Sequence, residues 1–201
     1  MTRIKSEQDI IDLTDEYGIL PFWSEEGFSA WKFSDVNFNS LWYLREKAVN
    51  SKQLVYGRFV NKKATFVSLK VLPHLCALRR DGYDFDSLAD EGKAPRREIQ
   101  VMNAVGSEPT PSYALGKSLG MKGFDGTVAS LQNKTYLCLS FKKSYMGTAL
   151  LCRPEDMFGY DFVRSAYALS AEENAQEILR LAKGLNEFTE KERIKILSIA
   201  V

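Results

Sequence analysis

The 201-residue chain has few of the residues on which catalytic and metal sites most often depend. His74 is the only histidine, so a Ser-His-Asp or Cys-His catalytic site would have to use it. The three cysteines, Cys76, Cys138 and Cys152, are far apart and form no C-x-x-C pair. This spacing indicates neither a disulfide framework nor a zinc knuckle. The sequence therefore predicts no metal and no cofactor.

Long apolar runs are also missing. No stretch reaches the length of a membrane span, and the N-terminus "MTRIKSEQDII" lacks the apolar core of a secretory leader. We expect a cytoplasmic protein that is not embedded in a membrane. The glycine-rich "GKSLGMKGFDG" does not fit a phosphate-binding loop, because Pro111 stands where that motif needs a glycine.

The net charge of +1 conceals an uneven distribution. Residues 51–150 carry 15 Lys and Arg against 8 Asp and Glu, whereas residues 1–50 carry 5 against 9 and residues 151–201 carry 7 against 9. A basic middle between acidic ends is a weak indication of an anionic partner. A solvated surface with local variation in charge explains the same numbers.

Periodicity and turn residues predict the same order of elements twice. Helices near 6–17, 25–33 and 39–49 precede a hairpin near 53–68. Helices in "RREIQVMNAVG", "PSYALGKSLG" and "GTVASLQNKT" then precede a hairpin made by "YLCLSF" and "TALLCR". Three helices followed by a two-stranded wing are typical of a winged helix-turn-helix. We predict an α+β fold with tandem winged-helix units at 1–75 and 94–154 and a C-terminal helical extension at 155–201; a single such unit with an extension is the alternative.

The second hairpin has a predictable register. If its turn centres on Tyr145, Cys138 lies opposite Cys152, and directly opposed strand residues have Cβ atoms about 5 Å apart. We therefore expect two neighbouring reduced thiols within the apolar core.

The helix predicted at 127–136 has two chemically different sides. At about 100° per residue, Val128 and Leu131 face the core, while Ser130, Asn133 and Lys134 lie opposite. Short polar groups beside lysines suit contact with double-stranded DNA. The predicted nucleic-acid-binding residues are Lys117, Lys122, Asn133, Lys134, Lys142 and Lys143. Any exposed helix face is polar, however, and lysines at hairpin turns also discourage edge pairing.

Three stretches resemble one protein family. "VYGRFVNKKATFVSLKVLP", "RRDGYDFD" and "FDGTVASLQNKTYL…EDMFGYD" are similar to the small bacterial proteins grouped as AlkZ-related, named for a distant likeness to AlkZ, a DNA glycosylase of tandem winged helices. The resemblance covers about residues 6–165 and implies a tandem winged-helix architecture. It also makes Gln132 a candidate catalytic residue, because Gln132 matches the first glutamine of the Gln-x-Gln or Gln-x-Asp motif of those glycosylases. Lys134 stands at the second position of the motif. From the helical pattern alone, Gln132 is a boundary residue that ties its helix to a neighbour.

The leading interpretation is a winged-helix DNA-binding protein without catalysis of its own. A glycosylase-like repair enzyme and a protein-interaction module are the alternatives. Salt-dependent DNA binding separates the first two from the third, and an exposed aromatic patch without basic neighbours would favour the interaction module.

Overall fold

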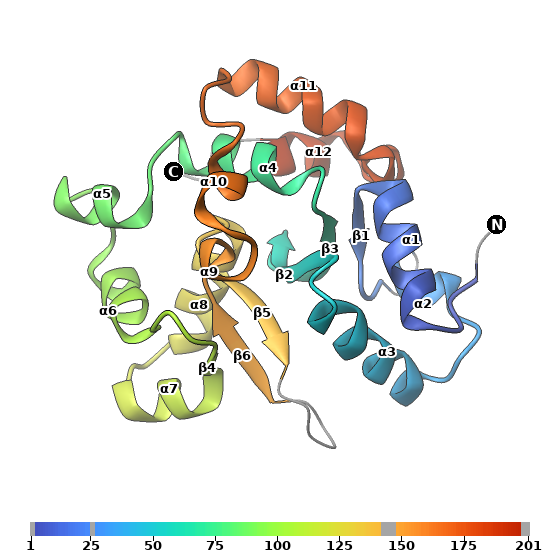
Figure 1. Cartoon of the computed structure of the whole chain (residues 1–201), viewed down its shortest axis with the longest axis horizontal. Helices are drawn as coiled ribbons and strands as arrows, with labels where there is room; N and C mark the ends of the chain where they lie inside the picture. The colour runs from blue at the N-terminus through green and yellow to red at the C-terminus, as the bar shows by residue number, and fades with distance from the viewer. Residues whose placement is uncertain (1–2, 25–26, 142–147, 198–201) are drawn as a thin grey trace.

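The computed structural model describes residues 3–24, 27–141 and 148–197 and confirms the α+β class. The first group of elements packs around a three-stranded antiparallel sheet in the order β1-β3-β2 (Figure 1). The elements are α1 (Glu7–Tyr17), β1 (Ile19–Pro21), α2 (Ala30–Phe33), α3 (Phe38–Asn50), β2 (Leu54–Val60) and β3 (Lys63–Ser68).

A second group of elements follows the same order along the chain. Its elements are α6 (Arg96–Ala104), β4 (Thr110–Pro111), α7 (Ser112–Leu119), α8 (Phe124–Asn133), β5 (Cys138–Phe141) and β6 (Ala149–Cys152). The sheet runs β4-β6-β5, so in both groups the first strand pairs with the last, and the middle strand of the sequence forms an edge. We call the two groups the first and second units.

The remaining helices connect the units and complete the chain. These are α4 (Leu72–Arg80), α5 (Phe85–Asp90), α9 (Pro154–Phe158), α10 (Tyr160–Arg164), α11 (Ala171–Leu181), the 3-10 helix η1 (Lys183–Glu187) and α12 (Glu190–Leu197). In Figure 1, α11 lies across the top of the view beside α4. Among the described residues, no helix is both long and apolar enough to cross a bilayer.

Local chemistry explains where the helices begin and end. Ser6 caps α1 by accepting a hydrogen bond from the Asp9 N–H, and the Asp9 carboxylate accepts one from the Ser6 N–H in return. Ser170 and Glu173 form the same reciprocal cap on α11. Gly18 ends α1 with a φ of 72°, a conformation that favours glycine.

Three structured segments were not predicted from the pattern. β1 and β4 contain three and two residues, which is too short for an alternation of apolar and polar residues to be recognised. α9 and α10 occupy 154–164, a stretch predicted only as part of an extension. α2 is shorter than the predicted 25–33, and residues 25–26 lie outside the described residues.

The predicted register of the second hairpin is confirmed. Cys138 lies directly opposite Cys152, and their sulfur atoms are 3.5 Å apart without a disulfide. Both side chains are buried. Hydrogen bonding to Cys152, together with burial, raises the pKa of the Cys138 thiol, which therefore stays protonated.

Three hydrophobic clusters hold the molecule together. One joins the helices of the first unit to one face of its sheet and includes Phe141 of β5, and another joins α5–α8 to the second sheet. The third cluster also draws on both units: it combines Val55 and Phe59 of β2 with Cys138 of β5 and Ile178 of α11. The first sheet is thus buried on both faces. The structure does not test the predicted boundaries at 1–75, 94–154 and 155–201, which stay predictions.

Candidate functional site: helix α8 and the pocket beside it

Much of the α8 surface predicted to face DNA is already occupied by protein. Ser130 donates a hydrogen bond of 2.8 Å to one carboxylate oxygen of Glu98 on α6, and the Lys134 ammonium lies 3.3 Å from the other. Glu98 is buried, and the Lys134 side chain is only 17% exposed. An uncompensated buried carboxylate is costly, so this cation first serves to neutralise Glu98.

Asn133 is engaged by a buried arginine. Arg79 of α4 donates from Nη1 to the backbone oxygen of Asn133 and to the carbonyl of Phe59, and from Nη2 to the carbonyl of Ile196 at 3.2 Å. Burial lowers the pKa of Arg79 to about 10, which leaves it charged at neutral pH. Contact of Asn133 and Lys134 with DNA stays a prediction, but neither residue is free in this structure.

Gln132 has a structural role. Its side chain is 1% exposed, and its Oε1 accepts a hydrogen bond of 2.9 Å from the backbone N–H of Arg58. Arg58 lies on β2, one of the two edge strands of the first sheet. The side chain therefore ties α8 to its neighbour, as the helical pattern predicted. This carbonyl oxygen is the atom that a water-positioning role would use.

Lys117 and Lys122, two of the predicted nucleic-acid-binding residues, are accessible to a ligand. Both are exposed and make no ion pair or hydrogen bond within the described part of the chain. Arg96 and Arg97 in the first turn of α6 share these properties. Neither arginine was among the residues predicted from the sequence to bind nucleic acid. Lys142 and Lys143 lie outside the described residues.

The first turn of α8 is the exposed part of this helix. Gly123 precedes it with a φ of 78° and no side-chain cap, and Asp125 and Gly126 are exposed. A Cβ on Gly123 would lie 3.6 Å from Nη1 of Arg97, so the arginine is close to this helix end. Backbone N–H groups at a helix N-terminus and nearby cations favour phosphate. Asp125 opposes that tendency, although it is paired with Arg58 at 2.9 Å.

A polar pocket of about 320 Å³ opens between α5, α9 and α10. Tyr136 and Met102 contribute to its wall, and its carboxylates come from the starts of α5 and α9. These acids are Asp84, Asp86, Glu155 and Asp156. Among the described residues, no group of three His, Cys, Asp or Glu side chains is arranged to hold a metal ion.

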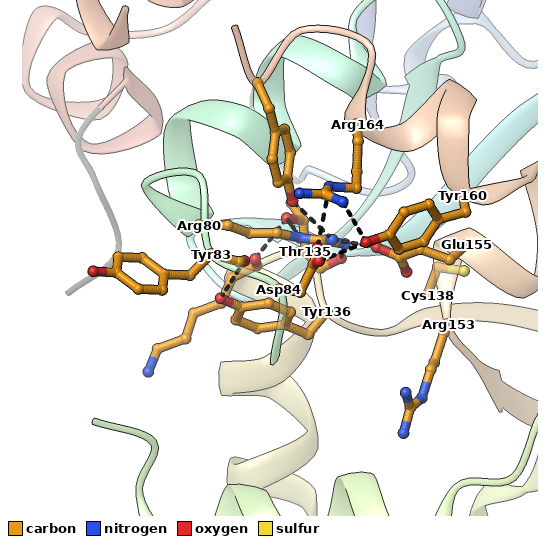
Figure 2. A network of polar contacts seen from close by, with 12 residues as sticks. Arg80, Tyr83, Asp84, Thr135, Tyr136, Cys138, Arg153, Glu155, Tyr160 and Arg164 are labelled. Carbon is orange, nitrogen blue, oxygen red and sulfur yellow. Dashed lines mark hydrogen bonds and ion pairs between the residues drawn. The ribbon is translucent and has the colours of Figure 1, made fainter. Parts of the chain in front are cut away.

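Arg80 is buried next to the pocket and holds two of its lining residues, Glu155 and Tyr136, in place. Its side chain is 1% exposed and donates from Nη1 to Glu155 and to the Tyr167 hydroxyl, and from Nε to the Thr135 hydroxyl at 3.1 Å. The guanidinium also lies over the Tyr136 ring, 4.8 Å from its centre. Figure 2 shows Arg80 reaching Thr135 and Glu155, while Arg153 points away from this network.

The acids of the pocket differ in how well they are paired. Asp84 accepts a hydrogen bond of 2.8 Å from the Tyr160 hydroxyl and lies 3.5 Å from Arg164, and Asp86 lies 3.8 Å from Arg153. Asp156 makes no hydrogen bond or ion pair within the described residues, and partial burial raises its pKa. It is therefore the carboxylate of this pocket most available to a ligand.

His74, which any catalytic site with a histidine would have to use, has a structural role. His74 pairs through Nδ1 with the amide oxygen of the buried Asn174 at 2.9 Å. Asn174 in turn donates to the carbonyls of Ala166, Leu169 and Ser170. The histidine therefore joins α4 to α11.

A family model described as AlkZ related matches residues 4–198, nearly the whole chain. The chain belongs to the AlkZ-related family. The match extends the resemblance seen in the sequence to the C-terminal helices. No curated protein and no solved structure matches this AlkZ-related chain.

Proposed function

We propose that this AlkZ-related protein binds double-stranded DNA through its second unit, and that both units are winged helices. The shared order helix, strand, helix, helix, strand, strand supports the architecture, as does the pairing of the first strand with the last in each sheet. In such folds the third helix enters the major groove with its N-terminal residues against the bases. In the second unit that helix is α8.

One observation carries the proposal: four cations that are unpaired within the described residues come from α6, α7 and the turn before α8. They are Arg96, Arg97, Lys117 and Lys122. The first turn of α8 is its exposed part, because Ser130, Gln132 and Lys134 are held by neighbouring elements. The helix would therefore approach DNA end-on. The cations would contact phosphates and supply affinity that depends on salt.

The test is fluorescence anisotropy with a labelled duplex at several salt concentrations. Arg97→Ala/Lys122→Ala should weaken binding to all duplex sequences alike and reduce the slope of log K against log salt by about 2. Lys183→Ala/Lys191→Ala removes two exposed lysines from the C-terminal region and is the charge-matched control. Equal duplex affinity of the two double variants would exclude the surface around Arg97 and Lys122 as the DNA-binding site.

The pocket favours a second candidate function, a glycosylase-like repair activity. Base excision draws a nucleotide out of the duplex into a pocket, and about 320 Å³ lies within the ~300–1,000 Å³ typical of ligand sites. Asp156, with its raised pKa, would act as the general base in place of Gln132. Release of bases from alkylated duplex should then occur and be lost in Asp156→Asn, while duplex affinity stays unchanged. No release by the wild type would leave DNA binding as the function.

A further inference from the structure

The first unit carries an exposed cluster of aromatic rings that the proposed function does not use. It consists of Trp23, Trp31, Phe38 and Trp42, and we call it the tryptophan cluster. Neighbouring ring centres lie 5.2–5.7 Å apart. All three tryptophans of the chain are in it.

The tryptophan cluster packs against the protein core on one side and is exposed to solvent on the other. Trp42 packs against the buried Phe22, with ring centres 5.5 Å apart, and the guanidinium of Arg45 lies 3.9 Å from the Trp42 ring centre. Trp23, Phe38 and Trp42 nevertheless remain 40–41% exposed. Contiguous exposed apolar surface of this kind marks an interaction site.

The charges around the cluster favour an anionic occupant. Asp35 is paired with Arg3 at 2.7 Å, and Glu46 lies 3.3 Å from Arg45. Lys32, beside Trp31, is exposed and makes no ion pair within the described residues. Lys47 is also exposed, but its ammonium lies 3.9 Å from a carboxylate oxygen of Glu7 and over the Tyr43 ring at 4.8 Å. Among the described residues of α2, α3 and the segment between them, the carboxylates are thus neutralised by arginines, and Lys32 is the cation without an ion-pair partner.

We infer that the tryptophan cluster binds unpaired bases of single-stranded nucleic acid. Proteins that bind single strands combine cations along the backbone with aromatic rings on which bases stack. Here Trp23, Phe38 and Trp42 supply the rings, and Lys32 contacts the phosphates. The inference rests on the proposed function in taking nucleic acid as the ligand, but it uses the first unit, whose α3 is the counterpart of α8.

Intrinsic tryptophan fluorescence tests the inference directly, because every tryptophan lies in the cluster. Titration of the wild-type protein with a short oligothymidylate at low salt should quench the emission, since a base stacked on the indole gives its excited state a non-radiative route back to the ground state. In anisotropy with the same oligonucleotide, Phe38→Ala and Trp42→Ala should each weaken binding about 5- to 100-fold. Trp42→Phe keeps a ring over Phe22 and should lose less affinity for the oligonucleotide than Trp42→Ala. This comparison separates lost stacking from a damaged fold. Leu179→Ala removes an exposed apolar side chain on α11 and should change neither the quenching nor the affinity for the oligonucleotide.

The two sites respond to different variants, so their failures are distinguishable. Arg97→Ala/Lys122→Ala should reduce duplex binding but leave the quenching by oligothymidylate, whereas Trp42→Ala should do the reverse. Duplex binding without quenching would overturn the inference alone and assign the tryptophan cluster to protein docking. Quenching without duplex binding would support the inference and overturn the proposed function. Neither response would overturn both.

Discussion

At the scale of single residues, two side-chain amides on helices each bind an edge strand of the other unit's sheet. Asn50 of α3 donates from Nδ2 to the Phe141 carbonyl at 3.0 Å and accepts from the Phe141 N–H at 3.1 Å, on edge strand β5. Gln132 of α8 accepts from Arg58 on edge strand β2. Each unit thus satisfies backbone groups at the open edge of the other. Such edges would otherwise be free to pair with another chain.

Replacing Gln132 separates its structural role from a catalytic one. Gln132→Ala leaves the Arg58 N–H without its partner in a partly buried position, so we expect the free energy of unfolding to fall by about 1–3 kcal/mol. Urea denaturation measures this change. Gln100→Ala on the exposed side of α6 is the control and should leave stability unchanged. Loss of base release with unchanged stability would restore Gln132 as a catalytic residue.

At the scale of elements, a glycine fixes how the C-terminal segment sits on the first sheet. A Cβ at Gly184 in η1 would lie 2.4 Å from the backbone oxygen of Ile19 on β1 and 3.1 Å from that of Tyr17. Backbone atoms cannot move aside as a flexible side chain can. The close approach of η1 to β1 therefore requires a residue without a side chain.

Gly184→Ala should destabilise the protein by about 1–3 kcal/mol, because the added methyl group overpacks this contact. Thermal or urea unfolding followed by circular dichroism gives the difference. Gly106→Ala is the matched control: its Cβ would meet no atom closer than 3.9 Å and should cost little. If both variants unfold like the wild type, η1 does not pack against β1 as described.

Elements were predictable where a pattern spans enough residues. Ser6 and Gly18 marked the ends of α1, and the turn centre gave the pairing of Cys138 with Cys152. β4 was not predictable, because its two residues become a strand only by pairing with β6. The sequence also did not show that part of the polar side of α8 is covered. Periodicity places Ser130 off the apolar face, but it cannot show that Glu98 of α6 accepts a hydrogen bond from Ser130.

At the scale of the whole molecule, the count of basic residues in 51–150 overstates the free positive charge. Arg58, Arg79, Arg80 and Lys134 are all committed to contacts within the protein. The pocket was likewise beyond sequence reasoning, since Asp84 and Asp156 are distant in the chain and meet only in the fold. Composition was a weak indication of an anionic partner. Among the described residues, the cations that could contact such a partner are those that the structure leaves unpaired.

The shared hydrophobic cluster predicts how the units unfold. Because Val55 of the first sheet and Cys152 of the second belong to one core with Ile178 of α11, neither unit can open without exposing apolar surface of the other. The chain should therefore unfold in one cooperative transition. Tryptophan fluorescence, which reports only on the first unit, and far-ultraviolet circular dichroism, which reports on all helices, should give the same urea midpoint.

A substitution in the second unit makes this prediction stringent. Leu115 of α7 is 6% exposed in the core of the second unit, away from every tryptophan, and Leu115→Ala should cost about 2–5 kcal/mol. If the units are coupled, the fluorescence midpoint shifts to lower urea together with the dichroism midpoint. Ile194→Ala, at a 63% exposed position on α12, should move neither midpoint. An unshifted fluorescence transition beside a shifted dichroism transition would mean that the units unfold independently, and that the shared cluster contributes little to the free energy of unfolding.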